Sequence, residues 1–158
     1  MLKRTKHLLS EIDNKLSGGM LDKSDYLTNK LYEYAIILFH AEFETHVKFM
    51  IFNQIGYNHI SEQIKKSMGK AISRGLSYGK IKDNFQKTFW NKVEYHLKQQ
   101  LPHGDDFETL KQNYSTLMEI RHDIAHTGST QRVVSLDIIK DAVRFCEYLI
   151  NSISKYYR

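Results

Sequence analysis

Apolar residues recur three and four positions apart in every long segment of this chain, and none alternates apolar with polar residues as a strand would. This spacing places the apolar side chains on one face of a helix, so it predicts an all-α fold. The expected helices cover residues 8–17, 24–56, 81–101, 105–128 and 135–153, with short helical pieces and loops between 57 and 80.

The longest segment is expected to form the central helix of the fold. Ser24 or Asp25 can cap its first turn, and the helix should end at about Gly56. Its apolar positions extend most of the way around the axis. This is typical of a helix that is packed on several sides, or packed in a core and also at a subunit interface.

The length of 158 residues suits one hydrophobic core, so residues 1–158 are expected to form a single domain. The longest strongly apolar stretch, Ala35 to Phe39, is far shorter than the roughly 20 residues that span a bilayer. No secretory signal pattern is found at the start of the sequence. The single cysteine, Cys146, has apolar neighbours, which indicates a buried thiol in a reducing compartment. We therefore expect a cytoplasmic protein without a membrane partner.

The net charge of +5 is compatible with an anionic partner such as nucleic acid, but charge alone proves little, because many basic proteins only have a solvated basic face. Six cations concentrate in the irregular middle of the chain, at Lys65, Lys66, Lys70, Arg74, Lys80 and Lys82. Tyr78 and Phe85 lie nearby and offer rings for base stacking, a combination that suits single-stranded RNA. A solvated basic loop would give the same pattern, and both interpretations stay open.

An arginine and a histidine, Arg121 and His126, stand five positions apart near the end of one expected helix. Cleavage of RNA by its own 2′-hydroxyl needs a group that takes a proton near neutral pH and a cation beside the phosphate. On an ideal helix the two residues are separated by about 140° around the axis and ~7.5 Å along it. Both would reach one phosphate if the helix frays near Gly128. In the alternative, Arg121 pairs with a carboxylate and His126 caps the helix C-terminus.

The segment from Glu119 to Gly128 resembles the signature of the HEPN superfamily (higher eukaryotes and prokaryotes nucleotide-binding domain). That signature is an arginine, four to six residues beginning with a polar one, and a histidine. Here the count is four and the polar residue is His122. Ala41 to Val47 is similar to the aromatic-glutamate helix of the prokaryotic ribonuclease branch. The helix that begins at Ser135 falls where the family places its last one. Between 57 and 100 the chain resembles the family only in being helical.

The resemblance implies an up-and-down helical bundle with additional short helices. It further implies a metal-independent endoribonuclease, without a cofactor, that acts as a toxin or phage-defence effector. In the family two domains form a dimer whose motifs face one cleft. A physical argument agrees, because transesterification needs both a base and an acid while one motif offers one well-placed histidine.

The resemblance and this argument together assign the roles. His126 would be the general base, its symmetry mate or His122 the acid, and Arg121 the clamp on the phosphorane. The products would carry a 2′,3′-cyclic phosphate and a 5′-hydroxyl. Members controlled by a nucleotidyltransferase have a tyrosine where this chain has Gly128, which argues against that route of regulation. Some other antitoxin, sensor protein or ligand stays open as a partner.

Three further residues are candidates for supporting roles. His122 shares a helical face with His126 and would orient the base or contact RNA, unless it is merely exposed. Asp123 could fix an imidazole tautomer, although an ordinary solvated carboxylate is the favoured interpretation. Glu44 would project toward the motif in the family packing, and the alternative is a carboxylate at the edge of the core that pairs with a lysine.

Rival interpretations of the motif involve other kinds of chemistry. His122 to His126 is similar to the zinc-binding pattern His-Glu-x-x-His, but no third ligand follows at a recurrent spacing. Some branches of the superfamily lack catalysis and bind nucleotides, RNA or partner proteins, so a non-catalytic helical module is the stronger alternative. A DNA-binding protein is also compatible with the charge, but the sequence has no recognisable recognition helix.

Overall fold

The computed structural model describes residues 2–54, 76–83, 85, 87–101, 106–132 and 134–155. Throughout these ranges the regular structure is helical, without a strand, so the predicted all-α bundle is confirmed. None of the described helices has the length and apolar character needed to cross a membrane. The helices are α1 (Lys3–Ser17), α2 (Tyr26–Gln54), α4 (Tyr78–Asp83), α5 (Lys87–Gln100), α6 (Phe107–Thr127) and α7 (Leu136–Lys155).

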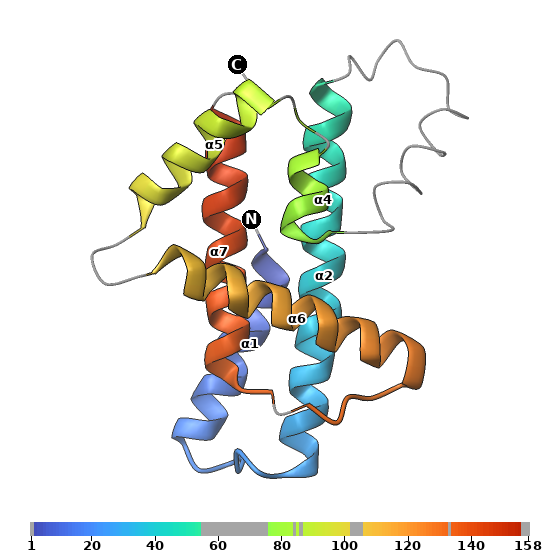
Figure 1. The fold of residues 1–158 in the computed structure, drawn as a ribbon. Helices are drawn as coiled ribbons and strands as arrows, with labels where there is room; N and C mark the ends of the chain where they lie inside the picture. Colours follow the sequence, from blue (N-terminus) through green and yellow to red (C-terminus); the bar gives the residue numbers. More distant parts are fainter. Residues whose placement is uncertain are drawn as a thin grey trace.

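Helices α2 and α7 form the centre of the bundle. α7 packs against α1, α2, α5 and α6, and α2 also contacts α1 and α6. α6 lies across α2 and α7, and its last turns extend beyond the bundle (Figure 1). This crossing carries the C-terminal end of α6, where the motif stands, away from the centre of the core.

One predicted helix, 81–101, was wrong because the structure divides it into α4 and α5. Its apolar residues recur every four positions, and each such step advances about 40° around a helix axis. A stripe from Ile81 to Leu97 would therefore turn through about 160°, and a straight helix cannot bury all of it on one side. The break near Phe85 solves this, because it leaves Ile81, Phe85 and Leu97 buried together with Trp90.

Tyr114 is an aromatic side chain that joins α6 to its neighbours. It is fully buried, and its ring lies 5.8 Å from that of Phe43 on α2 and 5.5 Å from that of Phe145 on α7. Its hydroxyl donates a hydrogen bond to the backbone carbonyl of Leu76, which precedes α4. One side chain thus holds three segments together. The buried thiol predicted at Cys146 is also confirmed, and burial raises its pKa.

The first turn of α1 is capped by a side chain from another helix. The Glu42 carboxylate of α2 accepts hydrogen bonds from the Arg4 N–H, the Thr5 N–H and the Thr5 hydroxyl at 3.2, 3.0 and 2.8 Å. Partial burial raises the pKa of Glu42, but these hydrogen bonds outweigh it and lower the pKa overall. Within the segment 41–47, Glu42 therefore fixes α1 on α2, while Phe43 lies in the core.

Candidate active site

The motif occupies the last turns of α6, which has a defined cap at each end. At its start the Asp106 carboxylate accepts a hydrogen bond from the Thr109 N–H at 3.0 Å, close to the predicted start of this helix at residue 105. At its end Gly128 adopts φ 78°, a left-handed conformation that favours glycine, and its N–H donates to Ile124 O at 2.9 Å. The fraying expected near Gly128 was therefore wrong, since α6 is regular through Thr127.

A cleft of about 460 Å³ lies beside the motif, with walls from α2, α4, α6 and the segment that follows α6. Its lining residues are His40, Leu76, Ser77, Lys80, Ser115, Met118, Glu119, Arg121, His122, Asp123 and Arg132. Four of the proposed site residues, Lys80, Arg121, His122 and Asp123, therefore share one cleft. His126 does not line it, which follows from the large angle between Arg121 and His126 on an intact helix.

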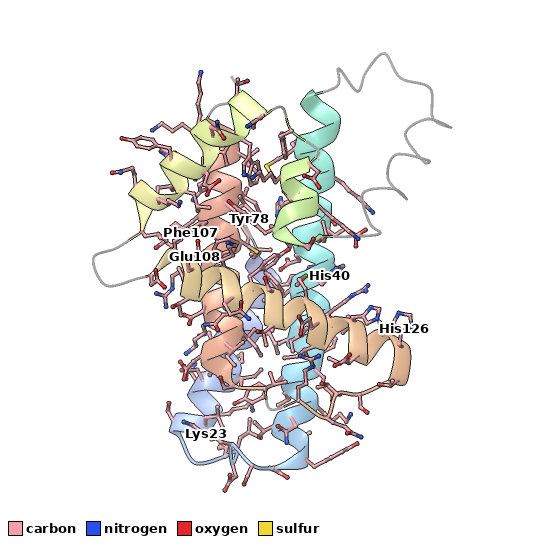
Figure 2. The ribbon with its side chains drawn as sticks, in the orientation of Figure 1. Lys23, His40, Tyr78, Phe107, Glu108 and His126 are labelled. Atoms are coloured by element: carbon pink, nitrogen blue, oxygen red, sulfur yellow. The ribbon has the colours of Figure 1, made fainter. Side chains whose placement is uncertain are left out.

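His126 does not line the cleft itself, but its ring contacts the ring of His122, which does. The centroids of the two imidazole rings are 4.2 Å apart with the rings tilted by 54°, and both side chains are exposed. The shared helical face predicted from their spacing is the reason for this contact. Figure 2 shows His126 at the outer end of α6, whereas His40 lies where α6 crosses α2. One chain therefore presents His126 to the surroundings rather than to its own cleft.

His40 is a cleft residue that the sequence did not single out. It is only 7% exposed, and its Nδ1 lies 3.6 Å from Glu44 Oε2 one turn further along α2. Burial lowers the pKa of His40 to about 4, and the Arg121 guanidinium adds to this effect. A neutral imidazole therefore lines the cleft together with Arg121 at neutral pH. The available signal was its spacing, because His40 follows Ile36 by four positions and precedes Phe43 by three, on the buried face.

The low pKa of His40 predicts acid sensitivity of the fold. An unfolded histidine binds its proton near pH 6.5 and the folded one near 4, so the unfolded chain holds more protons between these values. The free energy of unfolding should consequently fall by about 1.5 kcal/mol through this group between pH 6.5 and 5. Urea denaturation at both pH values checks this. His40→Gln should show a correspondingly smaller loss, and an equal loss in both proteins would contradict the assignment.

Asp123 and Glu119 are both paired with Arg132, which follows α6. Arg132 donates from Nη1 to Glu119 Oε2 at 2.6 Å and from Nε to Asp123 Oδ2 at 3.0 Å. In this arrangement Asp123 positions the segment after α6. Glu44 likewise forms an ion pair with Lys48, and it does not line the cleft.

The predicted RNA-binding cations are only partly described. Lys80 and Lys82 lie on the exposed side of α4, and Lys80 lines the cleft. Lys65, Lys66, Lys70 and Arg74 lie outside the described residues. The stacking role expected for Tyr78 and Phe85 was wrong, because both rings are buried against Trp90. Their positions near the lysines in the sequence suggested exposed rings, whereas both rings belong to the core.

His122 and His126 were also the two ligands of the rival zinc hypothesis. In the part of the chain that the structure describes, no group of three or more histidine, cysteine, aspartate or glutamate side chains could hold a metal ion. The imidazole pair thus lacks a third protein ligand within those residues, whereas structural and catalytic zinc sites use three or four.

The all-α helical bundle of the described residues is consistent with a HEPN-type domain. The family model described as RiboL-PSP-HEPN matches residues 2–158, so the chain belongs to that family. Members of the HEPN superfamily are often ribonucleases. Searches of curated proteins and of solved structures gave no match.

Proposed function

We propose that this protein is a metal-independent endoribonuclease that acts in the cytoplasm as a toxin or phage-defence effector. Residues 1–158 would form one catalytic domain. The observation that carries the proposal is the cleft beside α6, which Arg121 and His122 both line and where the His126 ring contacts that of His122. Membership of a superfamily rich in ribonucleases adds to this support.

The chemistry follows from the positions of these groups. A phosphate in the cleft would meet the Arg121 guanidinium, whose fixed charge stabilises the dianionic phosphorane more than the ground-state monoanion. His126 would remove the proton from the 2′-hydroxyl, and a second imidazole would protonate the departing 5′-oxygen. The 2′-oxygen–phosphorus bond forms as the 5′-oxygen–phosphorus bond breaks, which leaves a 2′,3′-cyclic phosphate and a 5′-hydroxyl.

The geometry also supports a homodimer as the active species. His126 does not line its own chain's cleft, so a single chain presents the catalytic groups on two sides of α6. Apolar side chains of α2 are exposed at Leu27, Tyr34, Ile37 and Phe49, within about 120° around an ideal helix axis. Such a face suits a second copy of the chain. A two-fold dimer would bring a second His126 and a second Arg121 without additional sequence.

The experiment that tests this function is incubation of the purified protein with end-labelled single-stranded RNA in excess EDTA. We expect cleavage to survive the chelator and to leave cyclic phosphate ends, which resist phosphatase until they are opened by acid. Loss of cleavage in EDTA with recovery on adding zinc would support the metal-dependent alternative. Light scattering in the same buffer measures whether the active species is a dimer.

A non-catalytic module that binds nucleotides, RNA or a partner protein is the second candidate. It is favoured by the same observation that points to a dimer, namely that Arg121 and His126 do not share one cleft within a chain. A folded dimer that binds RNA and cleaves none over a broad set of sequences would support it. Under the ribonuclease proposal, an antitoxin or sensor protein that covers the cleft would keep the activity in check.

A further inference from the structure

A second and larger cleft, of about 700 Å³, lies at the first turns of α2 and is also lined by residues 129–132 and 134. Its most exposed large hydrophobic side chain is Tyr26, which is 74% exposed and has Lys30 Nζ at 5.6 Å from its ring centroid. Asn29 and Gln131 line the same cleft with side-chain amides. An aromatic face, a cation and paired amide donors and acceptors thus face one space.

The walls of this cleft are held in place by hydrogen bonds. Glu33 Oε1 accepts from the Thr130 N–H at 3.3 Å, which fastens the segment after α6 to α2. The other oxygen of Glu33 pairs with Lys30 Nζ at 2.7 Å. The backbone at Thr130 is therefore fastened to α2, which lowers the cost of ordering this wall when a ligand binds.

This cleft adjoins the candidate active site. Arg132 lines both clefts, and its ion pairs with Glu119 and Asp123 anchor it to the motif turns of α6. The two sites are also close along the chain, because only Thr127 and Gly128 separate His126 from Ser129, the first lining residue after α6. A strand of RNA with its cleaved phosphate at Arg121 would extend over Arg132 into this space.

The charge of the second cleft suits such a strand. Lys23, Lys30 and Arg132 contribute three cations to its lining. Lys30 is paired with Glu33, and Arg132 with Glu119 and Asp123, so Lys23 is the cation of this lining that is not in one of these pairs and could meet a phosphate. Single-stranded RNA is bound where cations follow the backbone and aromatic rings stack on bases, and amide groups read the base edges. The volume lies in the range of pockets that hold a small ligand.

We propose that this cleft, which we call the Tyr26 cleft, binds one nucleotide of single-stranded RNA next to the cleaved bond. Its base stacks on Tyr26 while Asn29 and Gln131 contact the base edge. The proposal rests on the proposed ribonuclease function, for which it would supply the sequence preference.

The test measures binding of short 2′-O-methyl RNA, which lacks the attacking 2′-hydroxyl and cannot be cleaved. Fluorescence anisotropy of labelled oligonucleotides that differ at one position gives a Kd for each base. Tyr26→Ala is expected to raise the Kd about tenfold, the loss typical of one base–aromatic stack, whereas Tyr26→Phe should keep it. Asn29→Ala and Gln131→Ala should reduce the differences among the four bases.

Tyr95→Ala is the matched control, because Tyr95 is 67% exposed on α5 and does not line the Tyr26 cleft. An equal Kd for Tyr26→Ala and Tyr95→Ala, or no binding of any oligonucleotide, would overturn the proposal. Cleavage of unmodified RNA by the wild-type protein is measured alongside. Cleavage without a Tyr26 effect would refute the cleft and leave the ribonuclease in place. Tyr26-dependent binding without cleavage would refute the ribonuclease alone.

Discussion

Protein with His126→Ala is expected to lose RNA cleavage by at least about 10³-fold while it keeps its fold. A general acid or base contributes about 10²–10⁴-fold to a rate. In a homodimer one substitution removes the imidazole from both copies, so base and acid would be lost together. The fold should survive because His126 is exposed at the end of α6 and contacts only the His122 ring among the described aromatic groups.

Rates of cleavage of end-labelled RNA in EDTA, together with thermal unfolding of each variant, measure this effect. His7→Ala is a suitable control, because His7 is an exposed histidine on α1 that does not line the cleft. Near-wild-type cleavage by the His126→Ala protein would exclude His126 as the base.

Arg121 is expected to show a different pattern of loss, because its role is electrostatic. Removal of one group that stabilises transition-state charge costs about 10²–10³-fold in rate, which is the loss expected for Arg121→Ala. Arg121→Lys keeps the charge but loses the planar fork that binds two phosphate oxygens, so it should recover only part of the rate. Full activity of Arg121→Lys would indicate that the cation acts as a simple point charge.

The sequence predicted those features of the fold that depend on neighbours along the chain. Helical spacing identified α2, α6 and α7, and the capping residues Asp106 and Gly128 marked the ends of α6. These signals are local, since a cap bonds to an amide or carbonyl within one turn. The same dependence on near neighbours explains why the sequence wrongly predicted one helix over residues 81–101. Each residue there is compatible with a helix, and only burial against the rest of the core decides which rings turn inward.

The partners of the candidate site are long-range, and for this reason the sequence could not supply them. Arg132 joins Glu119 across 13 positions, and Thr130 joins Glu33 across 97. His40 becomes a cleft residue only because α6 crosses α2 beside it. The sequence identified Arg121 and His126 as a pair of residues suited to RNA cleavage. It did not show that the last turn of α6 stays helical, and this turn directs the two side chains to different sides of the helix.

Replacement of Tyr114 by alanine is expected to have the largest effect on stability. Tyr114 is fully buried, and its ring packs between Phe43 and Phe145. Truncation of a large buried aromatic side chain typically costs about 3–5 kcal/mol, because it removes buried area and leaves a cavity. This is a large part of the roughly 5–15 kcal/mol that stabilises a domain, so the protein should be partly unfolded near 37 °C.

Tyr114→Phe separates the hydrogen bond from the packing. It keeps the ring but leaves the buried Leu76 carbonyl without the Tyr114 hydroxyl, which should cost about 1–3 kcal/mol. Leu76 and Ser77 line the cleft beside Arg121, so this variant should also cleave RNA more slowly while it remains folded. Urea denaturation of the three proteins, followed by circular dichroism, gives both free energies. A Tyr114→Ala protein within about 1 kcal/mol of wild type would mean that α6 is seated on α2 and α7 mainly by its other side chains.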